Sequence, residues 1–245
     1  MQQDQYSKIG DKNLKIVNQS SNFTNWLYEQ IKPYIDGKIL EIGSGIGTYS
    51  AKIIADFPKN KIVLSDIDPN YLTKLKKQWQ MKNVFVDKLN LNSKADFLRI
   101  GGRFDTIIAL NILEHISNDL VALQNLRQKL NPNGQLILLV PAYPKLFNCI
   151  DEAVGHFRRY KKKDIINKAN KSGLKIQRIF YFNFFAIIGW VVNGFVFNKS
   201  EINEQAMGFF NYLVPSFKFV ENNILKKRAG MSLIAILKPK NDKNI

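Results

Sequence analysis

The chain has 245 residues, of which 45% are hydrophobic and 23% charged. This hydrophobic content suffices to build a core, which excludes general disorder, and the length fits one large domain or two small ones. Lys and Arg number 36 against 20 Asp and Glu, giving a net charge of +16. The charge favours an anionic partner, either nucleic acid or a membrane surface, although a general abundance of Lys, Asn and Ile would raise it without any partner.

The compartment is indicated by two features. The single cysteine, Cys149, excludes an internal disulfide framework and fits a reducing environment. The first 20 residues are polar and lack the apolar core of a signal peptide, so export by a cleaved signal is not expected. We therefore predict a cytoplasmic protein.

The predicted elements alternate between helix and strand. A helix is expected over 20–36, where apolar residues recur at helical spacing. Strands are then expected at 38–42, 61–66, 83–89, 103–112 and 135–143, with helices at 70–80 and 118–130 and a turn at 131–134. The fifth strand is almost wholly apolar, as a strand buried on both faces should be. Two more strands are expected at 174–182 and 232–238. The pattern predicts an α/β fold with a doubly wound sheet.

The chain is accordingly divided into an N-terminal helical segment, 1–36, a main domain, 37–240, and a tail, 241–245. The main domain contains an aromatic and basic insertion, 182–229, which is too long for an ordinary loop.

A glycine-rich turn follows the first strand, in the segment Glu41–Gly47 with the sequence EIGSGIG. Glycines there allow a sharp turn close to a ligand, and the next helix presents its N-terminal amides. Asp66 ends the second strand, where a carboxylate can bind both hydroxyls of a ribose. The spacing departs from the dinucleotide pattern GxGxxG, because Thr48 stands where the third glycine would be.

These motifs resemble those of the class I S-adenosylmethionine-dependent methyltransferases. The resemblance covers about residues 20–240 and includes FDTIIALNILEHISND at the fourth strand and LNPNGQLILLVPAY at the fifth. It implies a Rossmann-like sheet of seven strands with the last antiparallel, and S-adenosylmethionine as the cofactor. The segment from the end of the fifth strand onward, 140–165, and the upstream segment NWLYEQIKPYI, 25–35, further resemble a bacterial subgroup associated with glycosyltransferases and with cell-envelope glycan or lipid synthesis.

The resemblance also implies a set of cofactor-binding residues. The glycine turn should approach the methionine part of the cofactor, and Glu41 should hold the amino end of that part. Asp66 should bind the ribose. The next residue should cover one face of the adenine, and an Asn replaces the usual Asp that accepts from the adenine amino group. The implied residues are Glu41, Gly43, Ser44, Gly45, Gly47, Asp66, Ile67, Asn90, Leu91 and Asn111.

The acceptor side is predicted from residues after the fourth and fifth strands, because ligands bind beyond the carboxyl ends of parallel strands. Both histidines of the chain, His115 and His156, fall there and are candidate bases together with Tyr143. A structural role remains the alternative for His115. Three further residues, Arg158, Arg159 and Tyr160, are candidates for binding a phosphate or carboxylate of the acceptor, unless they belong to a solvated helix start. No metal site is predicted.

A run of 19 residues without a charge, 179–197, spans the end of the sixth strand and the start of the insertion. This length just qualifies as a transmembrane candidate, but its first residues complete the sixth strand, so a membrane span is not expected. We expect a hydrophobic cap over the active site or an interfacial helix, with a buried insertion as the alternative. The net positive charge lies mostly from 155 onward, where 17 Lys and Arg against 5 Asp and Glu give +12 of the +16.

The sequence thus predicts a methyltransferase for a small, sugar- or lipid-linked acceptor, with O-methylation favoured. Basic residues beside aromatics suggest an anionic membrane surface as a partner, and peripheral attachment at its inner face. One alternative is an RNA or protein methyltransferase that uses the basic surface, although nucleic acid is disfavoured because no added RNA-binding module is present. A second alternative is a non-catalytic cofactor-binding partner. The oligomeric state is left open.

Overall fold

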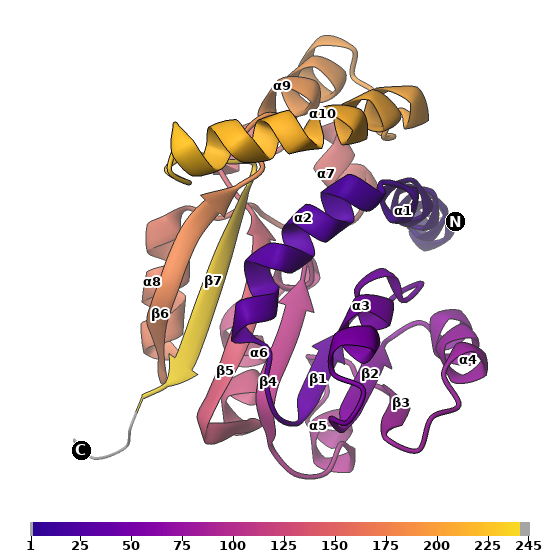
Figure 1. The fold of residues 1–245 in the computed structure, drawn as a ribbon, viewed down its shortest axis with the longest axis vertical. Coiled ribbons are helices and arrows are strands. Elements are labelled where there is room, and N and C mark those ends of the chain that lie inside the picture. The colour runs from indigo at the N-terminus through magenta and orange to yellow at the C-terminus, as the bar shows by residue number, and fades with distance from the viewer. Residues whose placement is uncertain (1, 241–245) are drawn as a thin grey trace.

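The computed structural model describes residues 2–240, with side chains from residue 9 onward; the predicted tail 241–245 lies outside the described residues. Its centre is a seven-stranded sheet in the order β3-β2-β1-β4-β5-β7-β6 (Figure 1). The strands are β1 (Ile39–Ile42), β2 (Ile62–Asp66), β3 (Val84–Lys88), β4 (Phe104–Leu110), β5 (Leu130–Pro141), β6 (Leu174–Phe182) and β7 (Ser232–Pro239). The first five are parallel, and β7 runs antiparallel to both of its neighbours. The predicted sheet is confirmed.

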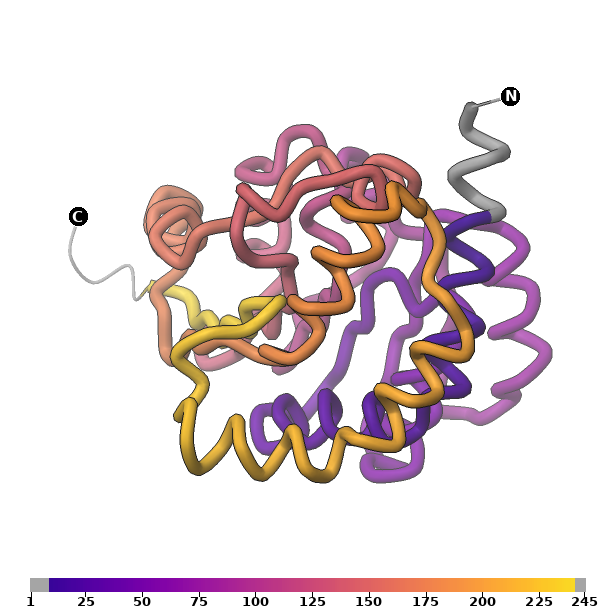
Figure 2. The backbone as a smooth tube through the Cα atoms, turned by 90° about the horizontal axis from the view of Figure 1, so that it is seen from above, coloured from indigo at the N-terminus to yellow at the C-terminus, as the bar shows by residue number. Residues whose placement is uncertain are grey.

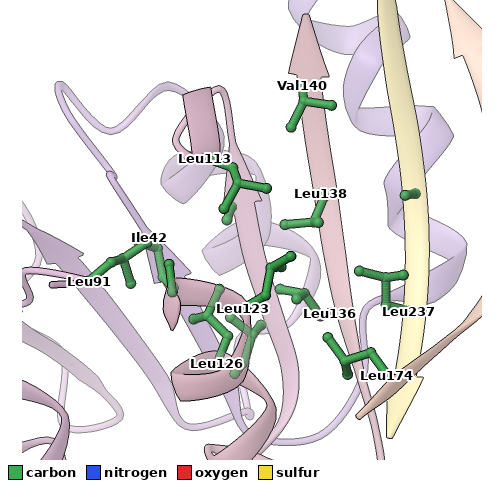
Figure 3. Close-up of a cluster of buried hydrophobic side chains, with 14 of the residues drawn as sticks. Ile42, Leu91, Leu113, Leu123, Leu126, Leu136, Leu138, Val140, Leu174 and Leu237 are labelled. Carbon is green, nitrogen blue, oxygen red and sulfur yellow. The ribbon is translucent and has the colours of Figure 1, made fainter. Parts of the chain in front are cut away.

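The sheet is buried on both faces because its central strands are continuous apolar runs. On β5, Leu136, Leu138 and Val140 point to one cluster, and the alternate residues Ile137 and Leu139 point to the other. The first cluster is covered by α5 (Lys94–Arg99), α6 (Asp119–Gln128) and α8 (Lys162–Lys171), and Figure 3 shows its leucines between helix and sheet. The second is covered by α2 (Ser21–Ile31), α3 (Thr48–Asp56), α4 (Pro69–Gln78) and α10 (Glu204–Asn223).

The N-terminal helices and the insertion together cover the carboxyl ends of the strands (Figures 1 and 2). Helix α1 (Gln2–Gln19) leads into α2, and α10 lies along α2. The two helices are joined by polar contacts: the side-chain oxygen of Asn211 accepts the backbone N–H of Phe23 at 3.0 Å, and Lys218 pairs with Glu29. The helical segment predicted at the N-terminus therefore packs on the predicted insertion, although nearly 200 residues separate them in sequence.

The insertion is helical, with α9 (Ala186–Val191), a short π-helix (Val192–Val196) and α10. Within residues 2–240, the structure contains no helix with the length and apolar character needed to span a bilayer. Large apolar side chains nevertheless remain exposed on the insertion: Ile188, Phe195, Val196, Phe197, Phe209, Tyr212 and Phe219.

One local expectation was wrong, and one short helix was missed. The turn predicted at 131–134 is a bulge inside β5, because Leu130 pairs with Phe104 and the next pairing on β4 is Gln135 with Thr106. Gly134 lies at this bulge, where an added Cβ would lie 2.8 Å from the carbonyl oxygen of Phe104. The short helix α5, which the sequence analysis did not predict, begins after Ser93, whose hydroxyl accepts the N–H of Asp96.

Candidate functional site

A cavity of about 890 Å³ lies at the carboxyl ends of the parallel strands. Its floor is formed by the residues that follow β1, β2, β4 and β5, and its walls come from α1, α9 and α10. Every predicted cofactor residue except Gly47 lines it: Glu41, Gly43, Ser44, Gly45, Asp66, Ile67, Asn90, Leu91 and Asn111. Both histidines and Arg159 line it as well. The cavity thus places the two predicted halves of the site side by side.

The glycines of the turn have different roles. Gly43 and Gly45 line the cavity with positive φ of 68° and 54°, and an added Cβ on Gly45 would meet only Leu14, at 3.6 Å. Gly47 does not line the cavity: it precedes α3 with φ of 85°, and a Cβ there would overlap the ring of Trp79. In this structure Gly47 therefore has a packing role beside Trp79, and its contact with the cofactor stays a prediction.

Glu41 lines the cavity and is buried, with 4% of its surface exposed. One carboxylate oxygen accepts hydrogen bonds from the hydroxyls of Ser44, at 2.9 Å, and Ser50. Burial raises the pKa of Glu41 to about 7, with the two hydroxyls opposing this rise and Asp66 adding to it. Its described donors are neutral, so an ammonium group in the cavity would find a carboxylate without a paired cation.

Asp66 lies at the end of β2, where its oxygens accept two backbone N–H groups. Gly45 donates at 2.8 Å and Asp68 at 3.0 Å, which fixes the orientation of the carboxylate. Burial raises its pKa despite these bonds. Because each carboxylate oxygen has two lone pairs, the group retains acceptors for a diol in the cavity.

The predicted adenine side is formed by the residues after β2 and β3. Ile67 is 56% exposed and lines the cavity, whereas Leu91 is buried and packs in the core beside it. The side-chain oxygen of Asn90 accepts the N–H of Asn92 at 2.9 Å, so one of its two lone pairs is already used. Asn111 lines the cavity in a left-handed conformation, with φ of 53°, and its N–H donates to the carbonyl of Leu139.

The two histidines lie together in the lining of the cavity. Their ring centroids are 4.6 Å apart, and Nδ1 of His156 lies 2.7 Å from Oδ1 of Asp151. Nε of Arg159 donates to both oxygens of Asp151, at 2.8 and 2.9 Å. Burial, followed by the neighbouring His156, lowers the pKa of His115 to about 4, so this imidazole is neutral at physiological pH.

Sequence reasoning missed Glu114, which lies between the histidines and the core. Its side chain is completely buried, neither oxygen has a hydrogen-bond partner, and burial raises its pKa to about 8. The residue precedes His115 in the short helix Leu113–His115, and this adjacency was the available signal. Asp151 was also missed as a site residue, although it caps α7 (Cys149–Ala153) and orients His156.

Three predicted acceptor residues are displaced from the cavity. Tyr143 stacks on Tyr181, with ring centroids 5.3 Å apart. Arg158 donates to the carbonyl of Ser117 and pairs with Asp119 at 3.1 Å, and the hydroxyl of Tyr160 donates to the same Asp119 at 2.9 Å.

Arg158 and Tyr160 point away from the cavity because their backbone is extended beside β5. A bridge between Ala142 and Tyr160 makes this stretch strand-like, so that alternate residues point in opposite directions. Arg158 and Tyr160 therefore turn to Asp119, and Arg159 alone turns to the cavity, where its guanidinium lies 4.3 Å from the ring centroid of Trp190.

The strand order, the antiparallel β7 and the cavity at the carboxyl ends define the class I methyltransferase fold. Residues 40–136 match the family model described as a methyltransferase domain. This match contains the glycine turn, Asp66, Asn90 and Glu114–His115. Residues 40–136 are thus similar to a methyltransferase domain, and the chain has the class I methyltransferase fold.

Known proteins resemble the chain over part of their length. The match to probable polyketide synthase 40 of Dictyostelium discoideum is 30% identical over an alignment of 145 positions, and it covers 49% of this chain and 6% of that protein. The match to ribosomal RNA small subunit methyltransferase C of Erwinia tasmaniensis is 30% identical and covers 53% and 38%. A crystal structure of a proposed sarcosine dimethylglycine methyltransferase from Galdieria sulphuraria aligns with a TM-score of 0.60 at 17% identity, covering 90% and 85%.

The methyltransferase match implies S-adenosylmethionine as the cofactor, and the cavity fits it in three respects. Glu41 offers a buried carboxylate without a paired cation to an amino group. Asp66 offers acceptors to the ribose, and Gly45 leaves open space for the chain that joins them. These residues belong to the set predicted from the sequence.

Proposed function

We propose that this chain is an S-adenosylmethionine-dependent methyltransferase that methylates a hydroxyl of a small, sugar- or lipid-linked acceptor. The proposal rests on one observation: the predicted cofactor residues and the histidine pair line a single cavity. The bound cofactor supplies a methyl group on a sulfonium, which is transferred by in-line displacement. The protein's main task is then to align the acceptor oxygen with that methyl group.

A hydroxyl acceptor is supported by the polar groups around the histidine pair. A hydroxyl must lose its proton during transfer, and imidazole and carboxylate side chains can assist this loss. His115, His156 and Glu114 lie together here. The segment after β4 reads NILE and lacks the tetrapeptide of the NPPY type that is used on planar amines.

A sugar- or lipid-linked acceptor is supported by the walls of the cavity and by the surface outside it. Residues of α9 and α10 such as Trp190, Met207 and Phe210 make the acceptor side apolar. The insertion also exposes the aromatic residues Phe195, Phe197 and Phe209. Aromatics beside Lys and Arg suit attachment to an anionic membrane, where a lipid-linked sugar would be presented. This assignment agrees with the resemblance to the subgroup associated with glycosyltransferases.

The acceptor is identified by mass spectrometry of cell-envelope glycolipids with and without the gene. We expect one species to be lighter by a single CH₂ when the gene is absent. The purified protein should restore that mass in extracts of the deletion strain when S-adenosylmethionine is added. Restoration by a variant with Asp66→Ala at the same rate would contradict the proposal, because that variant lacks the ribose carboxylate.

RNA methylation is the second candidate, and two observations favour it. The matched Erwinia protein is a ribosomal RNA methyltransferase, and most of the net charge of +16 lies after residue 154. Sedimentation with vesicles of anionic lipid distinguishes the two candidates. We expect binding to the vesicles that weakens with salt. No binding to vesicles, together with tight binding of tRNA or ribosomal RNA, would reverse the order of the candidates.

A further inference from the structure

Three potential metal ligands converge at the histidine pair. The ligand atoms of Glu114, His115 and His156 all lie within 4.8 Å of one another, and Oε1 of Glu114 is 3.8 Å from Nε2 of His156. Two ligands that each lie about 2.1 Å from a tetrahedral ion are separated by about 3.4 Å. Small movements of these side chains would therefore close the site around an ion.

Glu114 has the environment of a ligand that lacks its ion. Its side chain is 0% exposed, and neither carboxylate oxygen has a hydrogen-bond partner. Buried polar groups in folded proteins are almost always paired, so an orphaned carboxylate requires an explanation. The nearby cation Arg159 donates no hydrogen bond to either oxygen of Glu114; its Nε is bound to Asp151 and its Nη1 to the carbonyl of Ala142.

His156 is oriented as a ligand by a second carboxylate. Its Nδ1 lies against Asp151, which Arg159 keeps in place, so Nδ1–H donates to this carboxylate. The lone pair then belongs to Nε2, and this atom is the one that faces Glu114. A histidine held by a carboxylate through its other nitrogen is the usual arrangement at metal centres. His115 completes the set from the adjacent position, and both imidazoles line the cavity.

We propose that Glu114, His115 and His156 bind a divalent first-row transition-metal ion, with Zn²⁺ or Mn²⁺ as the expected ions. Two imidazoles and one carboxylate suit this class, whereas Mg²⁺ and Ca²⁺ prefer sites made of oxygen atoms. Three protein ligands leave at least one position open, and the cavity lies on that side. The sequence analysis predicted no metal, because a pair of adjacent ligands and one distant histidine have no characteristic spacing.

The role of the ion rests on the proposed function, whereas its binding does not. An acceptor hydroxyl in the open position would have its pKa lowered, as a metal-bound water does. Its proton leaves to a water molecule in the cavity. The oxygen then forms a bond to the methyl carbon while the carbon–sulfur bond breaks, and the electron pair of that bond stays on sulfur. The ion is neither oxidised nor reduced.

Binding is tested by ¹⁵N NMR of the imidazoles in chelator-treated, tag-free protein. The chain has two histidines, so the spectrum contains four ring nitrogens. We expect one equivalent of Zn²⁺ to shift one nitrogen of each ring, and Mg²⁺ at the same concentration to shift none. Unchanged imidazole signals in the presence of Zn²⁺ would overturn the site. This measurement uses the unmodified protein and is independent of any variant's folding.

Calorimetry on matched variants tests the ligand set. Glu114→Gln should weaken Zn²⁺ binding by about tenfold or more, and Asp151→Asn should weaken it roughly 10- to 100-fold because it orients His156. Glu152→Gln removes the same charge from an exposed neighbour in α7 and should bind as the unmodified protein does. Circular dichroism verifies that each variant is folded. Equal affinity in the Glu114 and Glu152 variants would overturn the assignment.

Methyl transfer with and without the ion separates the two proposals. Loss of transfer on chelation, and its return with Zn²⁺ or Mn²⁺, is expected. Transfer at full rate in stripped protein would overturn the ion's role in acceptor activation and leave the methyltransferase function standing. If no acceptor is methylated although Zn²⁺ shifts both imidazoles, the proposed function falls and the metal site stands.

Discussion

Replacing Glu41 with Gln should change how the stability of the cofactor-free protein depends on pH. Burial raises the pKa of Glu41 from 4.5 to about 7 in the folded protein. Between these values the folded state holds a proton that the unfolded state has released, so stability falls as pH rises from about 4.5 to about 7. The difference corresponds to about 3 kcal/mol at pH 8. Because Glu41 is buried, solvent screening reduces this figure little.

The amide that replaces the carboxyl group is neutral at every pH and can still accept from the hydroxyls of Ser44 and Ser50 through its oxygen. The Glu41→Gln variant should therefore match the unmodified protein at pH 5 and exceed its stability at pH 8. The expected gain in Tm is roughly 6–12 °C for a chain of this size. Glu114, whose pKa is also raised, contributes equally to both proteins and cancels in the comparison.

The assay is thermal unfolding followed by circular dichroism at pH 5, 6, 7 and 8 without cofactor. Glu152→Gln, which alters an exposed carboxylate, is the control and should show no gain that grows with pH. A difference in Tm between the Glu41 variant and the unmodified protein that stays constant from pH 5 to pH 8 would refute the reasoning. Glu41 would then be ionised in the folded state throughout this range.

Three further predictions concern other parts of the site. Asp66→Ala should weaken S-adenosylmethionine binding by about 2–3 kcal/mol, because the ribose loses a charged acceptor; titration calorimetry should show an affinity loss of more than about tenfold. Gly43→Ala should lower Tm, because φ is 68° and its Cβ would overlap Ile112, and an unchanged Tm would argue against this turn. Tyr160→Phe should cost about 1–3 kcal/mol in denaturant unfolding, because buried Asp119 loses a donor. That variant should keep its affinity for the acceptor, and a specific loss of acceptor binding would restore the role first predicted for the residue.

The fold could be predicted because its signals are local. The apolar runs of β4 and β5 and the glycine turn after β1 each identify an element from a few neighbouring residues, and their order specifies the sheet. The cofactor end was predictable for the same reason, since Glu41, Gly45 and Asp66 lie in or directly after strand ends. Gly47 was assigned to the cofactor because its contact with Trp79 could not be predicted: the two residues are 32 positions apart in sequence.

Which residues face the acceptor side of the cavity depends on the direction of each side chain, and tertiary contacts determine that direction. The three consecutive residues Arg158, Arg159 and Tyr160 were all predicted to bind the acceptor. The bridge to Ala142 divides them between Asp119 on one side and Asp151 on the other. Residue type at a loop position therefore identifies candidates, but the pairing with β5 selects among them.

Glu114 shows a different error: it was not considered as a site residue, because Glu side chains are ordinarily exposed to solvent. A Glu beside a His in a loop gives no indication that both of its oxygens are buried without partners. That environment arises because Phe157 donates its N–H to the carbonyl of Glu114, which brings the segment that carries His156 onto the helix Leu113–His115. The same contact assembles the three potential ligands. Because proline lacks this donor, Phe157→Pro should disperse the cluster and abolish the Zn²⁺-induced imidazole shifts, while S-adenosylmethionine binding at the Asp66 end is retained.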